Sequence, residues 1–168
     1  MNTMEAFNAA DGGRLTADLS ACCAVPAWVG AVVGARPYPD RDALLAAADA
    51  ASRALSWDDV LRGLAAHPRI GERAAGAGRE AAWSRQEQAG AADADEATRA
   101  ALAEANRAYE ERFGHVYLVF ASGRTDTELL AAARERLGND DATERAIVTD
   151  ELRKIALLRL ERLLDGLG

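Results

Sequence analysis

The sequence contains few of the residues that build metal centres and disulfides. Its 168 residues include two histidines, His67 and His115, and two cysteines, Cys22 and Cys23. The histidines are far apart and the cysteines are adjacent, so neither pair has the spacing of a zinc site. Adjacent cysteines are also poorly placed for a disulfide, and free cysteines are usually buried as small apolar groups. We therefore expect buried thiols, no metal site and a reducing, cytoplasmic setting.

Long apolar runs and an excess of positive charge are missing as well. No apolar run approaches the ~20 residues that cross a membrane. The first residues lack the basic start and apolar core of a signal peptide, and the last residues carry no peroxisomal tripeptide. The formal net charge of −7 argues against a nucleic-acid partner and against an anionic membrane, because both require clustered positive charge. A small anionic substrate is not excluded, since it needs only a local cationic pocket.

Helix-forming residues dominate what is present, above all alanine, leucine, arginine and glutamate. The clearest helix is 95–113, where apolar residues recur at spacings of three and four and Gly114 stands at the C-terminal cap. Caps and apolar spacing also predict helices over 40–54, 56–66, 125–138 and 141–164.

Residues 115–121 do not have a helical pattern. They form a short apolar run rich in β-branched and aromatic residues, which locally favours a buried strand. A lone strand would leave its backbone groups unpaired, so we predict an extended, irregular stretch instead. The predicted fold is all-α: a single compact multi-helix domain over 1–168, with one buried extended segment near 115–123.

Two short segments carry most of the chemistry-bearing side chains. The first, His67 to Glu72, reads HPRIGE, and the second, Trp83 to Gly90, reads WSRQEQAG. Pro68 stiffens the backbone beside His67. The imidazole titrates near neutral pH and could serve as a general acid or base, or could instead make a structural hydrogen bond at a helix end. Between the two segments, residues 71–82 are expected to form a flexible loop.

Glu87 has a structural and a functional interpretation. Ser84 and Glu87 have the spacing of a capping box, so Ser84 could begin a helix and Glu87 could cap it reciprocally. The two interpretations are compatible, because the N-terminus of a helix also favours an anionic ligand. Glu87 and Gln88 would then lie in the first turn, close to that ligand.

Arg159 is the most suggestive basic residue. Helical spacing places it on one face with Leu152, Ile155, Ala156 and Leu163. A guanidinium among apolar side chains requires a partner, and a substrate carboxylate could be gripped by two parallel hydrogen bonds. The alternatives are an intramolecular salt bridge or a side chain that extends to solvent.

These segments resemble the OHCU decarboxylase family, whose full name is 2-oxo-4-hydroxy-4-carboxy-5-ureidoimidazoline decarboxylase. Further matching blocks are residues 102–117, 134–140 and 153–160, and the similarity extends from about Phe7 to Leu164. The resemblance implies an all-helical fold, usually dimeric, without cofactor or metal. It implies conversion of OHCU to (S)-allantoin and carbon dioxide, at the end of urate degradation.

The resemblance also implies roles for individual residues. His67 matches the catalytic histidine and Glu87 its carboxylate partner. Arg159 matches a substrate-binding arginine near the C-terminus, although Arg153 and Arg162 are near enough to be the matching residue if the alignment is shifted by a turn. The other candidate substrate contacts are Pro68, Ser84, Arg85, Gln86, Gln88, Val119, Phe120, Ala121, Ser122 and Gly123, the last five through their backbone. His115 and Val116 depart from the family, which commonly has an aromatic residue followed by proline there.

Two other functions are compatible with the sequence. One is a non-catalytic helical module that binds a ureide or a partner protein. The other is a hydrolase of small cyclic amides, which would need an activated water, and the sequence shows no metal site to generate one. Convergence of His67 and Glu87 on one cavity would favour the decarboxylase. The sequence leaves open whether the chain is coupled to a urate oxidase or a hydroxyisourate hydrolase.

Overall fold

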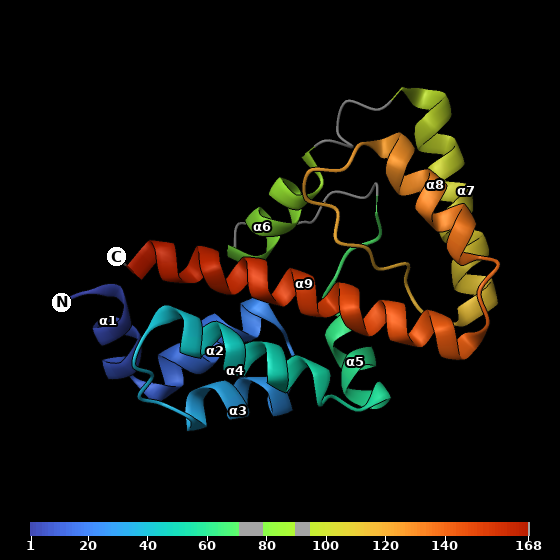
Figure 1. The fold of residues 1–168 in the computed structure, drawn as a ribbon. Helices are drawn as coiled ribbons and strands as arrows, with labels where there is room; N and C mark the ends of the chain where they lie inside the picture. The colour runs from blue at the N-terminus through green and yellow to red at the C-terminus, as the bar shows by residue number, and fades with distance from the viewer. Residues whose placement is uncertain (71–78, 90–94, 168) are drawn as a thin grey trace. The chain divides into compact units, whose positions relative to one another are not determined.

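The computed structural model describes residues 1–70, 79–89 and 95–167, and all regular secondary structure within them is helical (Figure 1). The helices are α1 Thr3–Ala9, α2 Gly12–Cys22, α3 Pro26–Gly34, α4 Arg41–Arg53, α5 Trp57–Leu64, α6 Arg79–Glu87, α7 Glu96–Phe113, α8 Asp126–Arg136 and α9 Asp141–Leu167. The all-α prediction is confirmed. None of the described helices is long and apolar enough to span a bilayer.

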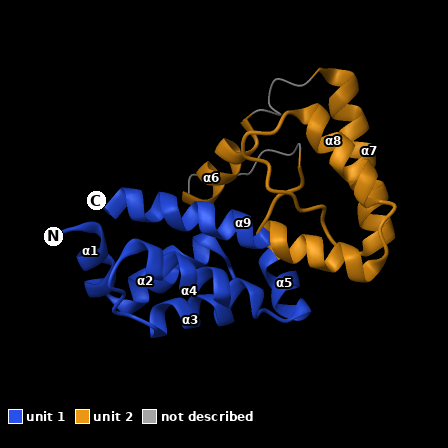
Figure 2. Cartoon of the chain, in the orientation of Figure 1, with its two compact units in different colours: residues 1–63, 152–168 blue, residues 64–151 orange. Residues whose placement is uncertain are grey.

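The chain divides into two compact units (Figure 2). The first consists of residues 1–63 and 152–168, and the second of residues 64–151. That the whole of 1–168 forms one domain stays a prediction.

The first unit is built on α2, α3 and α4, which pack consecutively. Trp28 of α3 is fully buried, and its indole N–H donates to Ala48 O and Ser52 Oγ of α4, at 3.1 Å each. Both cysteines are buried and free, as expected. Burial raises the pKa of Cys23 to about 12. These thiols are therefore packing groups.

The predicted helices are confirmed where cap residues define their ends. Asp95 accepts from the Thr98 N–H at 2.7 Å and begins α7. Gly114 ends α7 in the left-handed region with φ 80°, and its N–H donates to Glu110 O at 2.8 Å. A side chain at this φ is strained, so glycine suits the position. The last helix continues to Leu167, three residues beyond the prediction.

The second unit has its core between α7 and α8, which lie side by side (Figure 1). The buried core residues are Ile70, Leu102, Ala105, Tyr109, Tyr117, Val119, Ala121, Leu129, Leu130 and Ala133. Residues 116–121 pass through this core without forming a helix or a strand, as predicted. The core therefore contains both Ile70, three residues after His67, and residues of the extended segment.

Candidate functional site

His67 follows the end of α5 in a short irregular segment. Its backbone N–H donates to Leu64 O at 3.0 Å, and its side chain is half-buried. The hydrogen bond that His67 makes at the helix end is thus one of its backbone. Pro68 is also half-buried, next to the histidine.

Two side chains of α7 hold the residues that follow His67. Asn106 is 5% exposed and donates from Nδ2 to Ile70 O at 2.6 Å. One turn later, Glu110 accepts from Arg69 Nε at 2.7 Å and from Arg69 Nη2 at 3.3 Å. The first contact is buried and the second is exposed, so the first contributes more to fixing the backbone.

The predicted helix start at Ser84 is wrong. Helix α6 begins at Arg79, so Ser84 lies inside it and Glu87 is its last residue. Ser84 O accepts from the Gln88 N–H at 3.2 Å, a helical hydrogen bond that closes the last turn of α6. The Glu80–Ala82 stretch consists of strong helix formers, which explains the earlier start. The predicted anion site at a helix N-terminus is therefore wrong as well.

Glu87 lies at the end of α6 and not in its first turn. Its side chain is 7% exposed and lies at the C-terminal end of α6, where the helix dipole disfavours a carboxylate. Glu87 therefore does not cap the start of α6. Its role in the site stays a prediction.

The other α6 candidates differ in exposure. Ser84 is 4% exposed and shares a helix face with Glu87 by its spacing of three. Gln88 is half-buried and follows the last residue of α6. Arg85 is half-buried and Gln86 is exposed. Residues 71–78, which make up most of the predicted loop, lie outside the described residues. The last part of that predicted loop, residues 79–82, is helical instead.

The extended segment offers a row of backbone donors. In the part of the chain that the structure describes, the N–H groups of residues 118–121 donate to no backbone carbonyl. Val119 and Ala121 are each 3% exposed, and buried N–H groups are nearly always satisfied in proteins. The turn that follows is closed by the Arg124 N–H bonded to Ala121 O at 3.0 Å, with Gly123 at φ 78°. Phe120 and Ser122 are half-buried. Such a segment suits a ligand rich in carbonyl and carboxylate oxygens.

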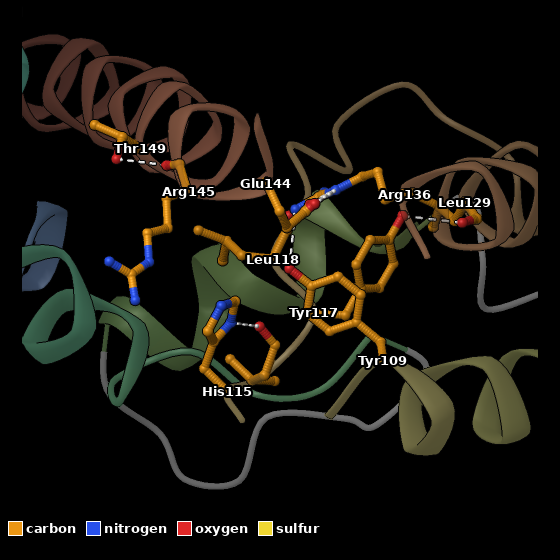
Figure 3. A network of polar contacts seen from close by, with 10 residues as sticks. Tyr109, His115, Tyr117, Leu118, Leu129, Arg136, Glu144, Arg145 and Thr149 are labelled. Atoms are coloured by element: carbon orange, nitrogen blue, oxygen red, sulfur yellow. Dashed lines mark hydrogen bonds and ion pairs between the residues drawn. The ribbon is translucent and has the colours of Figure 1, made fainter. Parts of the chain in front are cut away.

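A buried polar network supports this segment (Figure 3). Arg136 and Glu144 are 6% and 1% exposed and form an ion pair, and Arg136 Nη1 donates to Leu118 O at 2.5 Å. The guanidinium carbon lies 4.9 Å from the ring centre of Tyr117 and 5.6 Å from that of Tyr109. The Tyr117 hydroxyl donates to Leu129 O at 3.0 Å. The network thus anchors the backbone immediately before Val119.

Arg159 belongs to the first unit, whereas the other candidates belong to the second. It is 1% exposed, and Nη1 donates to Ala21 O at 3.1 Å. Its burial among apolar side chains agrees with the helical spacing. The neighbouring Arg153 forms an ion pair with Asp49 at 2.8 Å. The role of Arg159 in binding substrate stays a prediction.

Sequence reasoning missed Asn106, Arg136 and Glu144. The signal for Arg136 was present, because it follows Leu129, Leu130 and Ala133 on one helix face. That is the pattern that singled out Arg159. Asn106 likewise stands within the apolar pattern of α7. Neither pattern identifies the backbone carbonyl that each side chain contacts.

Comparison with known proteins decides the family. The sequence model described as OHCU decarboxylase matches residues 8–161. The chain belongs to the OHCU decarboxylase family. It is 31% identical over 145 residues to the uric acid degradation bifunctional protein TTL of Arabidopsis thaliana, covering 84% of this chain and 45% of that protein. It is 36% identical over 101 residues to the 2-oxo-4-hydroxy-4-carboxy-5-ureidoimidazoline decarboxylase of Amia calva, covering 59% and 58%. The chain thus spans about half the length of these curated relatives.

Solved structures agree with this assignment. An OHCU decarboxylase crystallised in the presence of (S)-allantoin is 29% identical, with a TM-score of 0.74 over 88% of this chain and 97% of that one. An (S)-allantoin synthase structure has a TM-score of 0.70 over 95% of this chain and 53% of that one. The second match is 18% identical and shows the fold alone.

Proposed function

We propose that the chain catalyses the cofactor-independent decarboxylation of OHCU to (S)-allantoin and carbon dioxide, in urate degradation. The observation that carries the proposal is the family match over residues 8–161. The buried Glu87 at an unfavourable helix end and the donor-rich segment 118–121 support it.

The chemistry of the substrate sets the tasks of the protein. Breaking the bond to the carboxylate leaves an electron pair on carbon, and the neighbouring ring C=N bond can accept it. The ring nitrogen takes up a proton, the hydroxyl proton leaves to form a carbonyl, and a proton is added to the carbon that bears the ureido group. Orientation, charge placement and one stereospecific proton delivery remain for the side chains.

The candidate residues divide these tasks. Glu87 accepts the hydrogen bond, and then the proton, of the substrate hydroxyl. His67 assists and supplies a proton from one face. Ser84, Gln88 and the backbone of 119–123 hold the ureido and ring amides, and Arg159 orients an anionic or carbonyl oxygen. Pro68, Arg85 and Gln86 complete the set of proposed contacts.

Circular dichroism of freshly generated OHCU tests the proposal. The protein should produce optically active allantoin of one sign, much faster than the uncatalysed reaction. His67→Ala and Glu87→Gln should each lower kcat by 10²–10⁴-fold, the usual contribution of a general acid or base. Glu104→Gln is the matched control, because Glu104 is exposed and pairs with Arg107 on the outer face of α7. Near-wild-type turnover in His67→Ala or Glu87→Gln would overturn the assignment of that residue. A folded wild-type protein that gives no acceleration would indicate the ureide-binding or partner-binding module instead.

The setting of the reaction is proposed with it. We propose a homodimer in the cytoplasm, functionally coupled to a urate oxidase and a hydroxyisourate hydrolase. The name of the Arabidopsis relative, a bifunctional protein of uric acid degradation, supports the coupling. Sedimentation equilibrium would show a mass near twice that of the chain, and a monomer across the working concentration range would exclude the dimer.

A further inference from the structure

We infer that Arg136 is a positioning residue that orients and polarises the peptide group between Leu118 and Val119, so that the Val119 N–H donates to an oxygen of the substrate. The inference rests on the proposed function and adds a residue that the sequence resemblance does not implicate. The ligand chemistry it implies is a carbonyl or carboxylate oxygen held by a backbone donor.

The first step is the placement of the guanidinium. Arg136 Nη1 donates to Leu118 O at 2.5 Å, and Arg136 is 6% exposed. Glu144 pairs with the same guanidinium through Nε, and the Tyr109 hydroxyl accepts from Nη2 at 3.5 Å. The stick view shows these groups gathered around Arg136 (Figure 3). Each edge of the guanidinium fork therefore has a partner, which fixes its orientation.

The second step is the effect on the peptide group. The carbonyl of Leu118 and the N–H of Val119 belong to one planar unit, so fixing one fixes the other. A charged donor on the carbonyl polarises the unit and strengthens its N–H as a donor, because hydrogen bonds in series reinforce one another. This effect is larger in a buried setting, and Leu118 and Val119 are each 3% exposed.

The third step is the acceptor for that N–H. In the described part of the chain, Val119 N–H donates to no backbone carbonyl. An arginine that only linked α8 to the extended segment would not need to contact the peptide group whose N–H has no backbone acceptor among the described residues. The proposed substrate carries carboxylate, ring carbonyl and ureido oxygens, and any of them would accept from Val119.

The experiment uses the full chain labelled with ¹⁵N-valine. In the wild type, (S)-allantoin should shift the amide resonance of Val119 and leave that of Val32, buried in α3, unchanged. Arg136→Lys should move the Val119 amide proton upfield and weaken its response to allantoin. Kinetics should show kcat/KM lower on the order of tenfold, less than the 10²–10³-fold that deleting such a donor costs.

Two further variants separate positioning from stability. Glu144→Gln breaks the same ion pair but keeps the guanidinium beside Leu118 O, so it should lower the melting temperature with less than a threefold loss of kcat/KM per folded molecule. Arg134→Lys, exposed on the same helix, is the control for the substitution itself. Equal losses in Arg136→Lys and Glu144→Gln, with an unmoved Val119 resonance, would overturn the inference.

The outcomes also separate this inference from the proposed function. A wild type that does not turn over OHCU defeats the function, while the upfield shift in Arg136→Lys still reports on the peptide group. If Arg136→Lys does not fold, the wild-type titration decides: a Val119 amide that does not respond to bound allantoin overturns the inference.

Discussion

Asn106→Asp should destabilise the protein far more than Asn106→Leu, although aspartate has nearly the shape of asparagine. Asn106 Nδ2 lies 2.6 Å from Ile70 O and both residues are buried. In the described structure, Asn106 Oδ1 has no hydrogen-bond partner. Aspartate replaces the one productive donor by a second acceptor, which then faces the Ile70 carbonyl.

The magnitudes follow from these contacts. Losing the donor leaves a buried carbonyl unsatisfied, which costs about 1–3 kcal/mol. Asn106→Leu also removes the buried, unpartnered Oδ1, so we expect a net loss near the lower end, about 1 kcal/mol. Asn106→Asp keeps that acceptor and adds an uncompensated buried charge, so we expect a loss of about 3–5 kcal/mol near neutral pH.

The pH dependence distinguishes charge from shape. Burial raises the pKa of the introduced carboxyl in the folded state above its unfolded value of about 3.9. Below that unfolded pKa both states are protonated, and the acid O–H can donate to Ile70 O. As pH rises through the interval between the two pKa values, the unfolded state ionises first and stability is lost.

Urea unfolding of the wild type and both variants at several pH values is the assay. The Asp and Leu variants should converge near pH 4 and diverge towards neutrality. A pH-independent difference between them, or wild-type stability of Asn106→Asp at neutral pH, would refute the reasoning. Because Ile70 follows His67 by three residues, both variants should also lower turnover.

Three further predictions concern other parts of the chain. Gly114→Ala should cost about 1–2 kcal/mol in urea unfolding, because φ is 80° there, whereas Gly30→Ala inside α3, with open space for its Cβ, should be neutral or stabilising. The thiols of Cys22 and Cys23 should not react with a thiol reagent at mildly alkaline pH until the chain is unfolded, because both are buried and the pKa of Cys23 is raised to about 12. Rapid labelling of the native protein would contradict this prediction. Burial also raises the pKa of Tyr117 to about 12, so the free energy of unfolding should fall as pH rises above about 10, where the unfolded tyrosine ionises first. Tyr117→Phe should make the free energy of unfolding less dependent on pH in this range. An unchanged dependence would exclude the contribution of Tyr117.

Most helix ends could be predicted because they are determined locally. Asp95 and Thr125 each accept a hydrogen bond from the N–H three residues later, and Gly114 takes a conformation that few other residues adopt. The extended segment was predicted for a different reason, the absence of a second strand to pair with. Its path could be foreseen, whereas the side chains that support it could not.

The start of α6 shows where local reasoning fails. A serine followed three residues later by glutamate satisfies the capping-box pattern at an N-terminus, yet the same spacing occurs within any helix. Which of the two applies depends on the residues upstream, and the Glu80–Ala82 stretch extends the helix back to Arg79. Contacts across the fold are similarly hidden: Asn106 and Ile70 are 36 residues apart in the sequence.

The two irregular segments of the proposed site are held in the same way, by a side chain that donates to a backbone carbonyl. The segment after His67 is fixed to α7 by a buried bond to Ile70 O, and the segment before Val119 is fixed to α8 by a buried bond to Leu118 O. Since α7 and α8 pack on each other, both segments are held by one packed pair of helices. The proposed chemistry depends more on these fixed backbone segments than on reactive side chains, because the substrate itself absorbs the electron pair. In solution, the planar intermediate is open to protons from both faces and gives racemic product. Loosening either buried bond should therefore reduce the optical purity of the allantoin before it abolishes the release of carbon dioxide.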